Sequence, residues 1–466
     1  MKRYGQLWEQ VISWENLVLA ARKAQRGKRH RDSVIRFNFG QERELLRLQG
    51  QLACWQYCPG AFTCHWIYER KARLISAAPY RDRVVHHALM NILEPILDKH
   101  FHPHSYACRK GKGTHAAANR LQHLMQGHRY ALQCDIRKFF PSIDYSALKQ
   151  AFRRLIKDRQ VLWLMDLIVD HSNEQEAVLD WFAGDDLFAP LEHRRGLPIG
   201  NLTSQWFANW MLDGLDHYIT SGLGLGAYVR YCDDFLVLDD DKARLREAAG
   251  QIGEFLARLR LRLHEGKLFV RPVRAGLTFV GYRIWPTHRI LRKDNIHRFR
   301  RRVWWMRQAY AAGLTDWPRV KLRLDSWIAH AHHTDCKLLI GRLSRQWVFQ
   351  RGTAANVPCS ARRQLEQQRQ QLPRGEPQQQ QARQSQQQHR VPCCPALSLA
   401  EGESTRNCTV YGSCERGLES PGCVPEPHFV ETRACGRMYV VRPDGSGRFA
   451  AEGPIRSLLL KCREAA

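Results

Sequence analysis

Hydrophobic and polar residues alternate with helical or strand periodicity through about the first 350 residues of the chain. Apolar positions spaced three and four apart predict helices, and short apolar runs between turn residues predict strands. The predicted helices cover residues 7–24, 80–100, 145–156, 201–219 and 242–259, with three more within 294–349. The predicted strands cover residues 130–136 and 277–285, with two short strands around an acidic turn in 228–238.

The order of these elements predicts an α+β fold, with helices packed on one face of a sheet. We expect a helical N-terminal segment over residues 1–45, a mixed domain over 46–290 and a helical domain over 291–350. The pattern changes beyond that point, because residues 364–388 contain 13 glutamines. Without sustained periodicity a segment cannot bury a core, so we predict that residues 351–466 form a disordered, glutamine-rich tail.

The charge of the chain restricts the classes of partner. Lysine and arginine total 72 against 45 acidic residues, a formal net charge of +27. Such an excess favours a polyanionic partner such as a nucleic acid. No apolar run approaches the roughly 18 residues of a membrane span, and the basic start of the chain lacks an apolar signal region. We therefore expect a cytoplasmic protein that makes no membrane contact.

Two acidic segments contain the candidate catalytic residues. Asp233 and Asp234 follow Tyr231-Cys232 between two apolar runs, and Asp135 lies near the end of the predicted strand before Phe139-Phe140. An exposed acidic turn is the ordinary reading of an Asp-Asp pair. Three carboxylates that converge from two strands can instead hold two Mg²⁺ ions, or Mn²⁺, about 3.5–4 Å apart. Such an ion pair suits nucleotidyl transfer.

These two motifs resemble the catalytic motifs of reverse transcriptases. Further segments stand in the order of that family over about residues 45–350: 71–75 with 80–85, 105–113, 196–205, 264–267 and 277–282. The resemblance implies a right-hand polymerase with fingers, a ferredoxin-like palm and a helical thumb. It also implies RNA-directed DNA synthesis, with template RNA, an RNA/DNA hybrid and deoxynucleoside triphosphates as partners.

The resemblance also assigns roles to single residues. It makes Asp135, Asp233 and Asp234 the catalytic metal ligands, joined by the carbonyl of Ile136. The ring of Phe140 would exclude a ribose 2′-hydroxyl. The residues expected to contact the incoming nucleotide are Arg73, Arg83, Arg109, Phe140, Ile199, Gly200, Gln205 and Lys267. Arginine suits phosphate oxygens, and Lys267 could protonate the pyrophosphate. Each of these residues could also be an ordinary core or surface side chain.

One position departs from the usual pattern. The family usually has Gln-Gly where this chain has Ile199-Gly200, and an aliphatic side chain cannot hydrogen-bond to the nucleotide. This resembles reverse transcriptases of diversity-generating retroelements, which copy template RNA inaccurately at adenines and usually act with a small accessory protein. Read one nucleotide forward, codons for residues 365–394 can encode an Asn-rich run like those in the proteins that such elements diversify.

Three alternatives stay open at this stage. The chain could be a group II intron or retron-type reverse transcriptase. It could be a non-catalytic RNA-binding protein on the same scaffold. The glutamine-rich segment could be a plain low-complexity tail.

Overall fold

The computed structural model describes residues 3–68, 72–173, 175–186, 188–189, 193–351, 429–432 and 438–441. The chain divides into two compact units, one of residues 1–49 and 59–376 and one of residues 50–58 and 377–466. In the second unit, strands β10 (Phe429–Thr432) and β11 (Met438–Val441) pair antiparallel. The glutamine-rich stretch predicted at 364–388 lies outside the described residues.

Four helices precede the first strand: α1 (Trp8–Ile12), α2 (Trp14–Ala24), α3 (Asp32–Phe39) and α4 (Gln41–Ala53). The single helix predicted over 7–24 is divided at Ser13, whose hydroxyl accepts the Asn16 N–H and caps α2. Helix α2 packs against α5 (Tyr80–His100), and the Asn16 side chain donates to the Ala88 carbonyl at 3.0 Å. The bounds predicted for α5 are confirmed, since Pro79 fixes its start.

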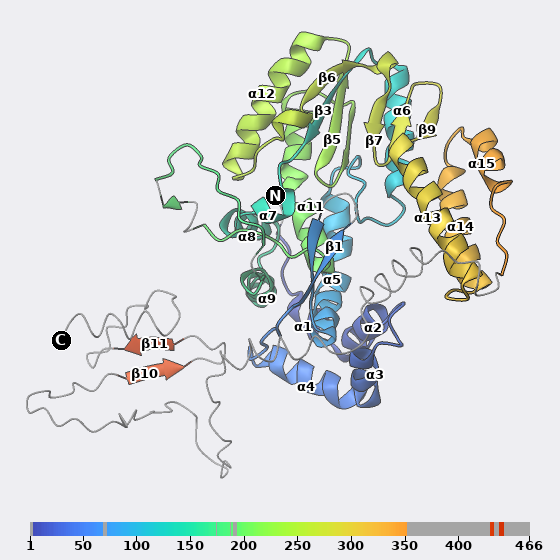
Figure 1. Ribbon diagram of the computed structural model, residues 1–466. Coiled ribbons are helices and arrows are strands. Elements are labelled where there is room, and N and C mark those ends of the chain that lie inside the picture. The colour runs from blue at the N-terminus through green and yellow to red at the C-terminus, as the bar shows by residue number, and fades with distance from the viewer. Residues whose placement is uncertain are drawn as a thin grey trace, which may run out of the picture. The chain divides into compact units, whose positions relative to one another are not determined.

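A four-stranded antiparallel sheet forms the centre of the first unit (Figure 1). Its order is β4 (Tyr228–Tyr231), β5 (Asp234–Asp239), β3 (Tyr130–Asp135) and β6 (Phe269–Pro272). Helices α11 (Leu202–His217) and α12 (Lys242–Arg258) lie on one face, where Tyr228, Phe235 and Val237 are buried. Helix α6 (Thr114–Gln126) packs on the other face against Val229 and Leu236. The prediction of helices on only one face of the sheet is therefore wrong. Both faces are covered, which explains the nearly continuous apolar runs of β4 and β5.

The other elements of this region connect or flank the sheet. They are β1 (Thr63–Tyr68), β2 (Ala72–Ala77), α7 (Phe139–Ser142), α8 (Tyr145–Leu155), α9 (Arg159–Asp170), the π-helix Tyr218–Gly222, and the 3₁₀ turns Glu265–Lys267 and Val273–Ala275. Strands β1 and β2 form a separate antiparallel pair.

A three-stranded sheet connects to the C-terminal helices. It contains β7 (Leu277–Phe279), β8 (Tyr282–Ile284) and β9 (Arg289–Leu291). The prediction of one strand over 277–285 is wrong, because the chain turns at Val280-Gly281, where both residues have positive φ. The predicted three helices are confirmed as α13 (Lys293–Ala311), α14 (Trp317–Ala331) and α15 (Lys337–Ser344). Phe299 and Trp327 stack at 3.9 Å between the first two.

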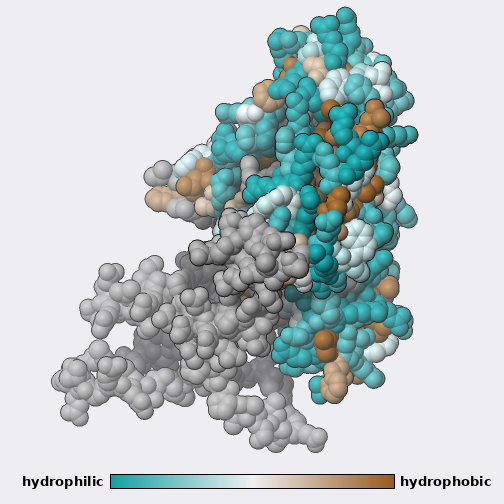
Figure 2. Space-filling model, turned by 45° about the vertical axis from the view of Figure 1, so that its right-hand side comes forward, coloured by the Kyte–Doolittle hydropathy of each residue, from teal (hydrophilic) through white to brown (hydrophobic). Residues whose placement is uncertain are grey.

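A tyrosine and two histidines join this C-terminal part to α6. The Tyr282 hydroxyl lies 2.9 Å from His115 Nδ1 of α6 and 3.0 Å from His330 Nδ1 of α14. The face shown in Figure 2 is largely hydrophilic, with small separate hydrophobic patches. None of the helices in the described ranges is both long and apolar enough to cross a membrane.

A buried ion pair fixes the hairpin of β4 and β5. Arg230 and Asp216 are both completely buried, and the guanidinium donates to both carboxylate oxygens at 2.5 and 2.6 Å. The same guanidinium donates to the Asn209 side chain and to the Cys232 carbonyl. Because a buried charge is tolerated only when it is paired, this network ties the hairpin turn to α11.

Replacing Arg230 with methionine should lower the free energy of unfolding by about 3–5 kcal/mol, because Asp216 would keep a buried charge without its partner. Urea denaturation measures the change. The control is Arg244→Met, which breaks the exposed pair with Asp239 and should cost less than about 1 kcal/mol. Equal losses in the two variants would contradict a special role for the buried pair.

Candidate active site

The two acidic segments meet at one end of the central sheet. Asp135 is the last residue of β3 and Asp234 the first of β5, and the two lie directly opposite each other in the antiparallel register. Asp233 lies in the two-residue turn between β4 and β5, and its carbonyl accepts the Ile136 N–H at 3.2 Å. The structure therefore brings together the three aspartates that the sequence singled out.

The turn holds its shape through an unusual backbone conformation. Cys232 has a φ of 59°, in the left-handed region that two-residue hairpin turns use. A non-glycine residue rarely adopts this conformation without support. The guanidinium of Arg230 supplies support by donating to the Cys232 carbonyl at 3.1 Å. The buried ion pair thus also fixes the position of Asp233.

Burial and mutual repulsion make the carboxylates unusual acids. Burial raises the pKa of Asp234 to about 8, and the negative charges of Asp135 and Asp233 act in the same direction. Burial likewise raises the pKa of Asp233, which the positive charges of Lys267 and Arg73 partly offset. Asp234 Oδ1 is buried and has no hydrogen-bond partner in the part of the chain that the structure describes. Both features indicate a place where added positive charge would be stabilising.

Lys267 supplies one such charge. Its ammonium group contacts Asp135 Oδ2 at 2.6 Å, although nearly half of the lysine side chain is exposed. The backbone on the other side of Asp135 is also fixed, since its carbonyl accepts the His264 N–H at 2.8 Å. The side chain of Ile136 is buried. Across the described ranges, no group of three or more His, Cys, Asp or Glu side chains forms a ready-made metal site.

The loop at residues 199–201 is hydrogen-bonded to β2 and the residue that follows it. The Ile199 carbonyl accepts the Ser76 N–H at 2.9 Å, and the Asn201 side chain bonds the Ser76 carbonyl and the Ala78 N–H. Gly200 has a φ of 118°, and a Cβ there would lie 2.9 Å from Ile75 Cγ2. This close approach explains the glycine. The exposed Arg73 lies on the same strand β2, and its charge reaches Asp233.

Two further predicted residues flank the loop and the turn. Phe140 is half-buried, with its ring edge-on to Phe139 at 5.6 Å, and its carbonyl accepts the Leu197 N–H. Gln205 is exposed on α11, and its side-chain Oε1 accepts a hydrogen bond from Cys108 Sγ at 3.4 Å.

Two other residues predicted to contact the nucleotide, Arg109 and Arg83, contact parts of the chain other than the acidic residues. Arg109 is nearly buried and donates to the Asp98 carboxylate at 2.6 Å and to the carbonyls of Asp98, His102 and Ser105. These bonds hold the Arg109 guanidinium in place, and its contact with the triphosphate stays a prediction. Arg83 lies over the Tyr80 ring at 5.6 Å, among basic residues of the N-terminal segment.

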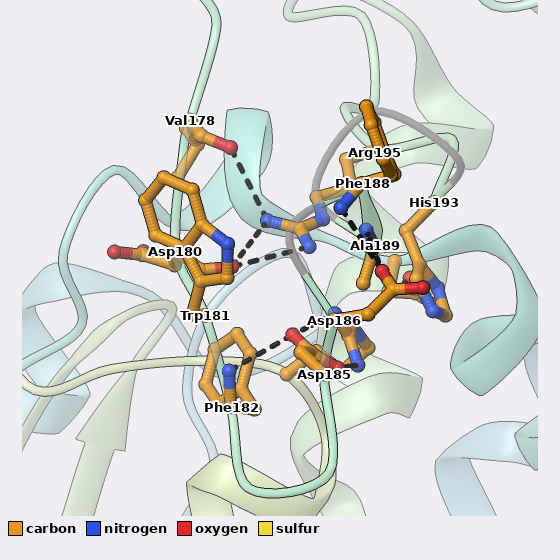
Figure 3. A network of polar contacts seen from close by, with 12 residues as sticks. Val178, Asp180, Trp181, Phe182, Asp185, Asp186, Phe188, Ala189, His193 and Arg195 are labelled. Carbon is orange, nitrogen blue, oxygen red and sulfur yellow. Dashed lines mark hydrogen bonds and ion pairs between the residues drawn. The ribbon is translucent and has the colours of Figure 1, made fainter.

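The loop after α9 carries a polar network that the sequence analysis missed (Figure 3). Arg195 donates to the carbonyls of Val178 and Asp180, and the Asp180 carboxylate pairs with Arg137, which lies two residues after Asp135. Arg262 also approaches Asp180, and its carbonyl accepts the Arg137 N–H at 2.9 Å. The loop thereby braces the chain immediately after the first acidic strand. Its charges show no regular spacing in the sequence that would have indicated these pairs.

Comparison with known proteins identifies the domain. Residues 68–284 match the family described as "Reverse transcriptase (RNA-dependent DNA polymerase)", so the chain carries a reverse transcriptase domain. Protein YkfC of Escherichia coli (strain K12) is 25% identical over 252 residues, 46% of this chain and 63% of that protein. Nuclear intron maturase 1, mitochondrial, of Arabidopsis thaliana is 26% identical over 96 residues, 21% of this chain and 14% of that protein.

Other matches are more distant. The putative COX1/OXI3 intron 1 protein of Saccharomyces cerevisiae (strain ATCC 204508 / S288c) is 23% identical over 153 residues, 33% of this chain and 17% of that protein. This chain spans less than two thirds of the length of each of the three relatives. A solved structure of telomerase from Candida albicans in complex with a fragment of telomeric RNA has a TM-score of 0.35 and 13% identity, and the match covers 51% of this chain and 48% of that chain.

The raised pKa of Asp234 predicts a dependence of stability on pH. The folded protein holds this proton up to about pH 8, whereas the unfolded chain loses it near pH 4, so stability falls as pH rises between these values. Asp234→Asn removes the effect. Its stability relative to wild type should therefore increase by about 2–4 kcal/mol between pH 5 and pH 8 in EDTA.

Urea denaturation at several pH values measures this difference, with the exposed Glu247→Gln as the matched control. A stability difference between Asp234→Asn and wild type that stays constant across pH would show that Asp234 is not an abnormal acid.

Proposed function

We propose that this chain is an RNA-directed DNA polymerase, which uses deoxynucleoside triphosphates to make DNA on a template RNA and forms an RNA/DNA hybrid. The observation that carries this proposal is the register of Asp135 against Asp234, with Asp233 in the adjoining turn, inside the reverse transcriptase domain. Three carboxylates at one sheet end are costly for stability, and nucleotidyl transfer supplies a reason for them.

The proposal includes two Mg²⁺ ions, for which Mn²⁺ could substitute, held by Asp135, Asp233, Asp234 and the Ile136 carbonyl. The residues fit such ions, because carboxylate and carbonyl oxygens are their preferred ligands and Asp234 Oδ1 has no other partner among the described residues. When bound, the ions would activate a primer hydroxyl and stabilise the leaving pyrophosphate.

Protein side chains complete the proposed site. Arg73 would bind the triphosphate, and the Phe140 ring would exclude a 2′-hydroxyl. Lys267, already beside Asp135, would donate a proton to the pyrophosphate. Gly200 allows the backbone to approach β2 closely, and Gln205 lies on the helix that follows the same loop.

In this proposal the central sheet is the palm, β1 and β2 belong to the fingers, and α13–α15 form the thumb. Helix α13 carries Arg298, Arg300, Arg301 and Arg302, whose charges suit a nucleic-acid backbone. A cytoplasmic location and a small accessory protein also belong to the proposal.

We further propose that synthesis is inaccurate at template adenines, as in diversity-generating retroelements, because Ile199 offers no side-chain hydrogen bond to the nucleotide. The second candidate is a group II intron or retron-type reverse transcriptase. The names of two relatives contain the word intron, which favours the intron type. The two candidates share the active site and differ in fidelity and in the RNA that they copy.

Asp135→Asn and Asp233→Asn should each reduce DNA synthesis on a primed RNA template by about 100-fold or more, because each removes a metal ligand. RNA binding should change little. Primer extension and filter binding measure the two properties, with Asp325→Asn on the exposed face of α14 as the control. Near-normal synthesis by either site variant would refute the assignment, and no synthesis by wild type would favour a non-catalytic RNA-binding protein.

Ile199→Gln should lower misincorporation opposite template adenine by roughly tenfold, because one hydrogen bond at the upper end of its usual range changes discrimination by that factor. Ile199→Val is the matched control, since it adds no hydrogen-bonding group. Sequencing of cDNA made from one RNA template measures the error rates. An unchanged adenine error rate in Ile199→Gln would place the source of infidelity elsewhere.

A further inference from the structure

A basic loop is held against α5 at the N-terminal end of the chain. Residues 25–31 form consecutive turns between α2 and α3, in which Lys28 N–H donates to the Gln25 carbonyl and Arg31 N–H to the Lys28 carbonyl. The Tyr80 hydroxyl of α5 donates to the Ala21 carbonyl at 3.0 Å, just before the loop. Near the end of α3, the Asn38 side chain donates to the side chain of Gln25, the first residue of the loop, at 2.9 Å. These contacts fix the loop on α5.

Helix α5 adds more nitrogen-bearing side chains to the same place. Arg83 lies over the ring of Tyr80, and the charges of Arg31 and Lys28 act on it and on each other. His87 is influenced by Lys28 and Arg83 as well. We define Lys28, Arg31, Arg83 and His87 as the N-terminal cationic patch.

No carboxylate compensates these charges within the described ranges. Lys28, Arg31 and Arg83 form no ion pair with any residue there, and Arg83 Nε is buried without a hydrogen-bond partner. His86 Nδ1, completely buried one residue from His87, also has no partner there. Burial lowers the pKa of Lys28, and repulsion from Arg83 and Arg31 lowers it further. Burial lowers the pKa of His87 to about 4, and the positive charges of Lys23, Lys28 and Arg83 act in the same direction, so its ring is neutral.

Converging cations without anions are destabilising in the free protein, and an anion that contacts all of them removes this cost. Arg31 and Arg83 provide planar forks that match phosphate oxygens, Lys28 a point charge and His87 a neutral donor. Lys28 and Arg31 are exposed, so the patch is open to an extended ligand. The net charge of +27 favours a polyanion over a single free anion.

We propose that the N-terminal cationic patch binds backbone phosphates of RNA outside the active site. This proposal rests on the proposed function and adds a second RNA contact to it. Arg73 is among the groups that act on Asp233, whereas Arg83 acts on Lys28 and His87. Figure 1 shows α2 and α3 well separated from the catalytic ends of β3 and β5. Arg83 is therefore assigned to this patch and not to the incoming nucleotide.

The test is the double variant Lys28→Gln/Arg31→Gln, in which both altered side chains are exposed. The matched control is Arg246→Gln/Arg258→Gln on the exposed face of α12, which removes the same charge. Filter binding of a structured RNA of roughly 100 nucleotides at several salt concentrations measures affinity. We expect about tenfold weaker binding and a salt slope shallower by about 1 to 2 for the patch variant alone.

A second assay separates this proposal from the proposed function. Extension of a DNA primer on a short RNA template, too short to reach the patch, should be equal in wild type, patch variant and control. Unchanged RNA affinity of the patch variant, or equal loss in the control, would overturn the patch. Loss of short-template extension in the patch variant would overturn its separation from the active site. Absent extension in wild type, with patch-dependent RNA binding intact, would refute the polymerase proposal alone.

Arg83 itself is tested by comparing lysine with glutamine. Arg83→Lys keeps the charge and should retain most of the RNA affinity, whereas Arg83→Gln should lose it. Thermal unfolding of both variants monitors the fold, since Arg83 is half-buried. Equal RNA affinity in the two folded variants would show that the charge at this position does not bind phosphate.

Discussion

The buried pair of Arg230 and Asp216 is the constraint on which the acidic site depends. It has no exposure to water, so its geometry tolerates little change. Arg230 also joins the hairpin to the segment after α5 through its main chain, because its N–H donates to the His104 carbonyl and its own carbonyl accepts the Tyr106 N–H. Helix α11, the segment after α5 and the hairpin turn therefore all contact Arg230 of β4. The acidic turn follows directly from that residue.

This rigidity matters because the negative charges of the three aspartates repel one another. Burial and repulsion would separate a flexible group of carboxylates or keep it protonated. Here the register of β3 with β5 and the bond from Ile136 N–H to the Asp233 carbonyl hold the backbone in place. The free energy of many backbone bonds thus maintains an arrangement that its own side chains destabilise. Sites that bind charged ligands commonly lower the stability of the free folded protein in this way.

The sequence predicted elements with strong local signals and missed those set by distant contacts. Helix α5 begins after Pro79 and has a clear apolar face, so its bounds could be predicted. The turn at Val280-Gly281 was missed in the prediction of a single strand, because Val280 and its neighbours favour a strand and outweigh the turn signal of Gly281. Arg109 was assigned to the nucleotide because its sequence context resembles a motif, whereas its partners, Asp98 and three carbonyls, are visible only in three dimensions. The aspartates were found because Asp135 and the Asp233-Asp234 pair together resemble the two catalytic motifs of reverse transcriptases, whereas an Asp-Asp turn alone is common.

In the loop at Ile199, the main-chain conformation does not depend on which side chain stands at this position. Its main chain is bound to β2 through the Ile199 carbonyl, and the glycine that follows fits closely against Ile75. The side chain at position 199 takes no part in either contact. The loop can therefore keep its conformation while the residue at this position varies. If the proposed role of Ile199 in copying accuracy holds, substitutions there would change accuracy without removing the main-chain bonds that hold the loop on β2.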